Sequence, residues 1–252
     1  MSKIFLSFGN ERFIKSRDRI KNEAQALEYN DKPLFDKFIV ETENIVNEKG
    51  FQDIIDKVPM TIGTGRGYYW YMWKPYIIHK TLSEMNDGDV LFYCDAGMQI
   101  FNNKNVVNKF INLIELVSSR ENCETGIATF ITTGLKEERF EYMYNTLSVF
   151  EHFGVGSNPD VTNTQQCQAG VNIICKTEKS VEIVKQWYEL ATTHPHLFIC
   201  DRRVYPKIIN KTMPGFRAHR HDQSVWSVLM KINKCNILTH NKNPVHQCHR
   251  RE

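Results

Sequence analysis

The sequence predicts an α/β fold in which helices flank a mixed, mainly parallel central sheet. Short apolar runs alternate with longer amphipathic stretches, and this order is typical of parallel strands joined by helical crossovers. The 252 residues are 41% hydrophobic and 12% aromatic, which is enough for a substantial core. No linker, composition shift or internal repeat interrupts the chain, so we expect one domain over residues 1–252.

The first sixty residues establish the β-α-β-α order. Residues 3–8 (KIFLSF) form an apolar run that predicts the first strand. Asn10 is placed to cap the helix that follows. Residues 37–41 predict a second strand, and residues 44–57 predict a helix that is broken near Gly50.

The rest of the chain continues this alternation. A turn at residues 86–89 and the acid Asp95 bound an apolar run at 90–93, which predicts a buried strand. Further strands are expected at 126–132, 168–174 and 236–239. Further helices are expected at 105–118, 136–150, 177–191 and 222–232, and the long polar segments between them are 154–166 and 193–218.

Charge and cysteine usage limit the possible function classes. The formal net charge is only +3 and the basic residues are dispersed, so a nucleic-acid-binding module is disfavoured. Seven cysteines without a CxxC pair favour reduced thiols and a cytoplasmic location. Neither a signal peptide nor an apolar stretch of the ~20 residues that a membrane span needs is visible, so a soluble protein is expected.

Asp95 is the leading candidate for a functional side chain. A carboxylate at the carboxyl end of a buried strand lies where open α/β sheets bind their ligands. The small neighbours Ala96 and Gly97 leave room for a ligand to approach the backbone. The carboxylate could bind Mn²⁺ or Mg²⁺, which pair carboxylates with phosphate oxygens. A turn aspartate that caps the following loop is the competing interpretation.

Basic and aromatic residues precede this strand. Lys74, on the first turn of an expected helix, and Arg66 could each bind a diphosphate, although a solvated charge is the commoner role for either. Trp70 and Trp73, at helical spacing, are expected in the core. The glycine-rich loop 63–67 lacks the Lys-Ser/Thr of a P-loop, so we do not assign it to phosphate binding on that basis.

A second polar segment, residues 219–223 (HRHDQ), precedes the last expected helix. Its Asp222 could be the N-cap of that helix, or a general base that takes a proton from an acceptor hydroxyl. Near the C-terminus, His246, Cys248 and His249 suggest a metal site, but no second cluster has zinc spacing, so a polar tail is favoured over a zinc site.

Five of these segments together resemble glycosyltransferases of the GT-A fold. The resemblance is to the small nucleotide-sugar-dependent enzymes of large DNA viruses and bacterial polysaccharide clusters. It covers most of the chain and is carried by KIFLSFGN, RGYYWYMWKPYII, DGDVLFYCDAG, QCQAGVNII and HRHDQSVWSVL. It implies a single GT-A-like, Rossmann-like domain, with a nucleotide-binding half over 1–100 and an acceptor-binding half over 101–252.

The resemblance also implies roles for single residues. Asp95 would hold Mn²⁺ or Mg²⁺ on the donor diphosphate, with His246 or His249 completing the metal site. Gly97 stands where such enzymes usually carry a second aspartate, so Asp95 would bind the ion alone, or would contact the sugar or ribose instead. The residues implied for donor binding are Ser7, Phe8, Gly9, Arg66, Lys74, Asp95, Ala96 and Gly97. Those implied for the sugar or acceptor are Gln168, Ala169, Gly170, His221 and Gln223.

The expected function is therefore transfer of a sugar from a nucleoside-diphosphate donor, such as a UDP-sugar, to a hydroxyl of a glycan or other acceptor. Asp222 would be the catalytic base if the reaction inverts the sugar configuration. Asp222 or Gln168 would position the sugar if the configuration is retained. The alternative is a non-catalytic nucleotide-sugar or carbohydrate-binding protein of the same fold, which the missing second acid favours. A viral enzyme of glycan biosynthesis would act in the host cytoplasm.

Overall fold

The computed structural model describes residues 1–58, 67–132, 139–201, 203–205 and 211–247. Within these ranges, six strands form a central sheet in the order β4-β1-β5-β8-β7-β9. The strands are β1 (Lys3–Phe8), β4 (Lys37–Glu41), β5 (Val90–Cys94), β7 (Ile127–Ile131), β8 (Cys167–Cys175) and β9 (Asn236–Leu238). β8 runs antiparallel to both of its neighbours, and the other pairings are parallel. The predicted α/β class with a mixed, mainly parallel sheet is confirmed.

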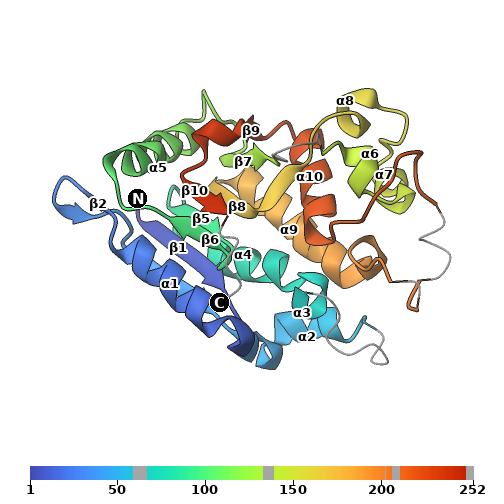
Figure 1. Ribbon diagram of the computed structural model, residues 1–252, viewed down its shortest axis with the longest axis horizontal. Helices are drawn as coiled ribbons and strands as arrows, with labels where there is room; N and C mark the ends of the chain where they lie inside the picture. The colour runs from blue at the N-terminus through green and yellow to red at the C-terminus, as the bar shows by residue number, and fades with distance from the viewer. Residues whose placement is uncertain (59–66, 133–138, 202, 206–210, 248–252) are drawn as a thin grey trace.

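The helices of the described ranges cover this sheet (Figure 1). They are α1 (Ile14–Gln25), α2 (Lys49–Ile55), α3 (Gly67–Trp70), α4 (Trp73–Glu84), α5 (Lys104–Ser118), α6 (Glu141–Tyr144), α7 (Leu147–His152), α8 (Pro159–Thr162), α9 (Glu178–Thr193) and α10 (Asp222–Ile232). α4 packs against α9 and α9 against α10, while α6, α7 and α8 gather beside α10 (Figure 1). None of these described helices has both the length and the apolar character needed to cross a bilayer.

Strand β5 shows how the sheet separates two cores. Val90, Phe92 and Cys94 pack into a cluster with α1 and α5, whereas Leu91 and Tyr93 pack into a cluster with α4, α9 and α10. Successive side chains of a strand point to opposite faces, and both faces are covered here, so the strand is a continuous apolar run. Asp95 follows Tyr93 by two residues, so it is directed to the face that α4 and α10 cover.

Two small antiparallel pairs were not expected from the sequence. β6 (Met98–Ile100) pairs with β10 (Val245–Gln247), which brings the C-terminal segment beside the chain that follows Asp95. β2 (Glu28–Tyr29) pairs with β3 (Lys32–Pro33) around a tight turn. Strands of two or three residues are too short to produce a readable alternation.

Most expected elements are confirmed, and two details are wrong. The helix expected over 44–57 is broken near Gly50, as predicted; the break is at Glu48, between a 3₁₀ helix (Glu43–Asn47) and α2. Asn10 precedes a short 3₁₀ helix (Glu11–Phe13), but its side chain makes no capping hydrogen bond. The described part of the helix expected over 136–150 consists of α6 and α7, because the backbone between them is extended at Asn145.

Candidate active site

Three charged side chains from three separate elements meet at one edge of the sheet. The Lys74 ammonium lies 2.7 Å from Oδ2 of Asp222 and 3.2 Å from Oδ1 of Asp95. Lys74 comes from the first turn of α4, Asp95 from the end of β5, and Asp222 from the start of α10. We call these residues the charge cluster. It holds one positive and two negative charges when all three groups are ionised.

The position of Asp95 follows from the strand that precedes it. Its backbone N–H still donates to the carbonyl of Gly170 on β8, at 2.8 Å, so the residue is fixed at the end of the β5–β8 pairing. The buried Tyr93 hydroxyl donates to Oδ1 of Asp95. Burial and the adjacent carboxylate raise the pKa of Tyr93, so its hydroxyl stays protonated. The Asp95 side chain is 34% exposed and borders the cavity described below.

Gly170 is required by the Asp95 side chain. A Cβ on residue 170 would lie 2.7 Å from Oδ2 of Asp95, much closer than nonbonded atoms approach. The absence of a side chain therefore lets the carboxylate lie against the β8 backbone. This steric reason for the glycine could not be read from the sequence, because the two residues are neighbours only in the sheet.

Lys74 is only 2% exposed, so its charge depends on its two partners. Burial would lower the pKa of Lys74, but the carboxylates of Asp222 and Asp95 outweigh burial and raise it. The ammonium also lies 5.5 Å from the ring centroids of Trp73 and Tyr93, close enough for cation–π attraction. The lysine is therefore a permanently charged group within the protein wall.

Asp222 is 4% exposed and occupies the first helical position of α10. Burial raises the pKa of Asp222 to about 6, while Lys74 opposes that rise. A carboxylate with a pKa near neutrality can both accept and release a proton under ordinary conditions. His221, and not Asp222, is the N-cap of α10, so the capping interpretation of Asp222 is wrong.

The segment that leads into α4 has an unusual backbone. Gly67, Tyr68, Tyr69, Trp70 and Tyr71 all have positive φ, between 51° and 65°. A non-glycine residue in this left-handed region costs about 1–2 kcal/mol, so the surrounding packing must hold the turn. The turn delivers Trp70 to the core, as predicted, and places Tyr71 at the cavity.

A cavity of about 470 Å³ lies against the charge cluster. Amide side chains reach it from Gln168, Gln223 and Asn243, and guanidinium side chains from Arg139 and Arg220. The other lining residues are Tyr71, Met98, Thr132, Ala169, Gly170, Ala218, His219, His221, His240 and Val245. A pocket with several convergent polar groups and a perturbed carboxyl pKa is the natural candidate for a ligand site.

The two histidines before α10 are tied to the preceding loop. His219 Nε2 lies 2.9 Å from the carbonyl of Leu197, and His221 Nδ1 lies 2.8 Å from that of Phe198. Burial lowers the pKa of His219 to about 3, so it is neutral at physiological pH. His221 has φ 57° and ψ −121°, a strained conformation immediately before Asp222.

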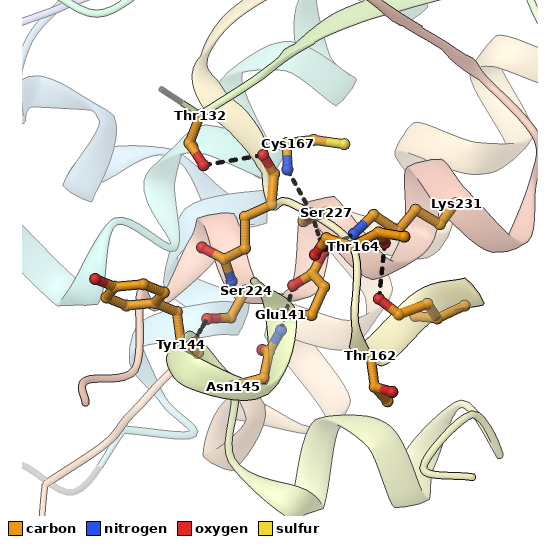
Figure 2. Close-up of polar contacts among 12 residues, drawn as sticks. Thr132, Glu141, Tyr144, Asn145, Thr162, Thr164, Cys167, Ser224, Ser227 and Lys231 are labelled. Atoms are coloured by element: carbon orange, nitrogen blue, oxygen red, sulfur yellow. Dashed lines mark hydrogen bonds and ion pairs between the residues drawn. The ribbon is translucent and has the colours of Figure 1, made fainter. Parts of the chain in front are cut away.

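A buried polar network holds the middle of α10 against α6 and β8 (Figure 2). The enclosed Glu141 carboxylate accepts hydrogen bonds from Ser227, from Asn145 at 2.6 Å and from Lys231 at 2.6 Å. Ser227 in turn accepts a hydrogen bond from the backbone N–H of Cys167, at 2.6 Å. Buried hydrogen-bond networks of this kind favour one arrangement of the elements that they join.

Further contacts tie the first turn of α10. Ser224 donates to the carbonyl of Tyr144 at 2.8 Å (Figure 2) and accepts from the backbone N–H of Arg220 at 2.9 Å. Gln223 donates through Nε2 to Oε1 of Gln166 at 2.9 Å. Residues before and after Asp222 in the sequence are therefore fixed by hydrogen bonds, and they hold Asp222 in place.

The structure brings together some of the sequence-predicted site residues. Those that line the cavity are Lys74, Asp95, Gln168, Ala169, Gly170, His221, Asp222 and Gln223. The amide of Gln168 also donates to the carbonyl of Ile131, at 3.1 Å. Arg66 and His249 lie outside the described residues.

The other predicted residues lie away from this cavity. Ser7 is buried and donates to the carbonyl of Cys94 at 2.7 Å, and Phe8 stacks on Trp73 with ring centroids 3.9 Å apart. Gly9 is buried against Arg17. Ala96 is buried in the core formed with α1 and α5, whereas Gly97 is exposed. His246 is exposed on β10, with its ring 5.2 Å from that of Phe101.

The cavity residues that the sequence analysis did not assign to the site include Arg139, Arg220 and Asn243. Arg139 gave no signal, because a single arginine is usually a solvated charge. Arg220 could have been found, because it lies within the HRHDQ segment that the sequence analysis singled out for Asp222. Asn243 could not have been found from the sequence, because it comes to the cavity only when the C-terminal segment folds beside β6.

The described residues do not fit a divalent metal ion. In nucleotide sites Mn²⁺ and Mg²⁺ are held by one or two protein carboxylates together with phosphate and water oxygens, so those carboxylates must be free to coordinate. The ammonium of Lys74 already lies between Asp95 and Asp222, and Gly97 supplies no third carboxylate. Over the described ranges, no group of three histidine, cysteine, aspartate or glutamate residues is arranged to hold a metal.

Comparisons with known proteins find likenesses in structure only. No protein-family model and no curated protein sequence matches the chain. Mouse xyloside xylosyltransferase 1, in its apo form, is similar over 95% of this chain and 85% of its own, with 9% identity and a TM-score of 0.49. A glycosyltransferase involved in glycosylation of the major capsid of PBCV-1 is similar over 100% of this chain and 96% of its own, with 12% identity and a TM-score of 0.42.

A third solved structure, core-mannan synthase A from Aspergillus fumigatus in its Mn/GDP form, is similar over 96% of this chain and 73% of its own, with 9% identity and a TM-score of 0.49. Identities and scores this low carry no argument about what this chain binds or does.

Proposed function

We propose that this protein is a GT-A-type glycosyltransferase that moves a sugar from a nucleoside-diphosphate donor to a hydroxyl acceptor. The observation that carries the proposal is the charge cluster. It combines a carboxylate whose pKa is raised to about 6, a second carboxylate and a fixed ammonium in the wall of a cavity at the sheet edge. This edge is the ligand-binding edge of open α/β sheets.

The lining of the cavity suits a sugar. Sugar hydroxyls both donate and accept hydrogen bonds, and carboxylate and amide side chains offer matching partners. Asp95, Gln168 and Gln223 border the cavity, together with Gly170 of β8. Tyr71 adds an aromatic ring on which the apolar face of a sugar can pack.

In the proposed reaction, Asp222 accepts the proton of the acceptor hydroxyl. The acceptor oxygen then forms a bond to the anomeric carbon of the sugar, and the bond from that carbon to the diphosphate oxygen breaks. The nucleoside diphosphate leaves with the bonding electrons. A base with a raised pKa suits the first step, because it is ionised at neutral pH and still basic enough to hold the proton.

Lys74 has two parts in this scheme. Its charge opposes the burial cost of ionised Asp222, so that the carboxylate is available as a base. It also pairs with Asp95, which fixes that carboxylate at the border of the cavity, where it can accept hydrogen bonds from sugar hydroxyls. If the reaction retains the sugar configuration, Asp222 and Gln168 position the sugar instead.

The predicted donor-binding residues that border the cavity are Lys74 and Asp95, and a UDP-sugar is the first donor to test. The alternative of a non-catalytic sugar-binding protein is favoured by one observation. Both carboxylates of the charge cluster are already paired with Lys74.

One experiment separates the two functions. The protein is incubated with a panel of UDP-, GDP- and dTDP-sugars without an acceptor, and released nucleoside diphosphate is measured by chromatography. Slow release from one donor, lost in Asp222→Asn, supports a transferase in which water replaces the acceptor. Binding of a donor by calorimetry without any release supports the non-catalytic alternative. Neither binding nor release from any donor contradicts the proposed function.

A further inference from the structure

We infer that the donor diphosphate is bound by the guanidinium groups of Arg139 and Arg220, without a divalent metal ion. This inference rests on the proposed function and names the groups that bind the anionic part of the donor. The reason is that both carboxylates of the charge cluster already pair with Lys74, whereas a metal would need them as free oxygen ligands.

The charge cluster cannot supply the positive charge that a diphosphate requires. Lys74 contacts both Asp95 and Asp222, so the ionised cluster carries a net charge of −1. A diphosphate next to it would face two carboxylates through a low-dielectric wall, where repulsion is stronger than in water. A metal ion bound to these carboxylates would lie next to the Lys74 ammonium, which already neutralises part of their charge, so the two cations would repel each other.

Arg139 and Arg220 supply positive charge to the same cavity. Both line it, and neither forms an ion pair with a carboxylate among the residues that the structure describes. A guanidinium presents N–H donors in a planar fork that matches two phosphate oxygens, which makes arginine the usual side chain for such an anion.

Arg220 is held in place for this contact. Its guanidinium carbon lies 4.8 Å from the ring centroid of Tyr144, and its backbone N–H donates to Ser224 on α10. Tyr144 and Ser224 are themselves hydrogen-bonded to each other, at 2.8 Å. The arginine is therefore anchored to α10, the helix that carries Asp222. The guanidinium that would bind the phosphate and the carboxylate that would accept the proton thus keep a fixed relative position.

The inference is tested by calorimetry with UDP, GDP, dTDP and ADP, in excess EDTA and again with Mn²⁺. We expect at least one nucleoside diphosphate to bind in EDTA, with a Kd that changes less than about twofold when Mn²⁺ replaces EDTA. Arg139→Gln and Arg220→Gln should each weaken its binding about tenfold or more, as expected for the loss of charge-assisted hydrogen bonds. Arg120→Gln, which removes an arginine from a different cavity of about 260 Å³, should leave the Kd unchanged.

Each other outcome has a definite meaning. Binding that requires Mn²⁺ overturns the inference and leaves the proposed function standing. Binding in EDTA that neither arginine substitution weakens overturns the assignment to Arg139 and Arg220. Absence of binding by every nucleoside diphosphate under both conditions overturns the proposed function itself. If a glutamine variant fails to fold, as judged by circular dichroism, Arg139→Lys and Arg220→Lys replace it, and each should weaken binding because the fork is lost.

Discussion

Lys74 and Asp222 form an ion pair at 2.7 Å although both residues are almost completely enclosed by protein. Enclosed charges are costly to desolvate, and such a pair is a weak source of net stability. Asp95 adds a second carboxylate to the same ammonium at 3.2 Å. An arrangement with this cost indicates a chemical role, and the predictions below follow from it.

The first prediction concerns the lysine. Lys74→Met should lower the free energy of unfolding by about 3 kcal/mol at pH 8, because two carboxylates would lose their counter-charge in an enclosed site. Chemical denaturation followed by circular dichroism measures this loss. Adding Asp222→Asn to the variant should recover part of it. Lys179→Met removes a surface ion pair with Glu124 and should leave the melting temperature nearly unchanged. An equal effect of the two lysine substitutions would contradict the account.

The second prediction concerns catalysis and pH. The base Asp222 must be ionised, so kcat should rise with pH through about 6 and then level off. Donor turnover measured from pH 4.5 to 8.5 provides the profile. Asp222→Asn should remove both the activity and this dependence. A rate that does not change between pH 5 and 7 would exclude Asp222 as the base.

The third prediction uses the same group to link pH with stability. Folding raises the pKa of Asp222 from its ordinary value of 3.8 to about 6, so the folded protein binds more protons than the unfolded chain between these values. The stability of the wild type relative to Asp222→Asn should therefore fall as pH rises from about 4 to about 6, and stay constant above that. Parallel urea titrations of both proteins measure the difference. A relative stability that rises over this window would mean that the sign of the shift is wrong.

The fourth prediction concerns Gly170. Gly170→Ala would place a Cβ 2.7 Å from Oδ2 of Asp95, so the carboxylate must move. Since small displacements of reacting groups slow catalysis steeply, transfer should fall about tenfold or more. A crystal structure of the variant would show whether Asp95 has moved. Gly156→Ala serves as the control, because its Cβ would meet only an ordinary contact at 3.7 Å.

The fifth prediction concerns the network that supports α10. Glu141→Gln should lower the free energy of unfolding by about 3 kcal/mol, because Lys231 loses its charged partner in a closed site. Glu182→Gln, on the exposed surface of α9, should have little effect. Denaturant titrations of the two variants compare them. Similar stabilities would show that the network does not hold the helix.

The centre of the sheet was predictable from the sequence because its four inner strands are apolar on both faces: β1, β5, β8 and β7. Residues 90–93 are one example, and their two cores lie on opposite sides of β5. The pair β6 and β10 escaped prediction, because three-residue strands depend on a partner far away in the chain. The left-handed turn at 67–71 could not be foreseen either, since tyrosine and tryptophan disfavour positive φ and only tertiary packing holds them there.

The sequence predicted which residues belong to the candidate site better than it predicted the contacts between them. Lys74, Asp95 and Asp222 each stood out through their position at the start of a helix or the end of a strand. Their meeting at one ammonium depends on how α4, β5 and α10 cross, and sequence periodicity carries no information on that crossing. Arg139 and the steric need for Gly170 likewise become visible only when distant segments are brought together.

The most direct test compares nucleoside diphosphate release by three proteins at a temperature at which circular dichroism shows each of them to be folded. These are the wild type, Asp222→Asn, and Asp160→Asn as a surface control on α8. With the preferred nucleotide-sugar and an acceptor glycan, the wild type and the control should release the nucleoside diphosphate at the same rate. Asp222→Asn should fall at least a hundredfold, the lower range expected for loss of a general base. Near-normal release by Asp222→Asn would show that the Lys74–Asp95–Asp222 cluster is not the catalytic site.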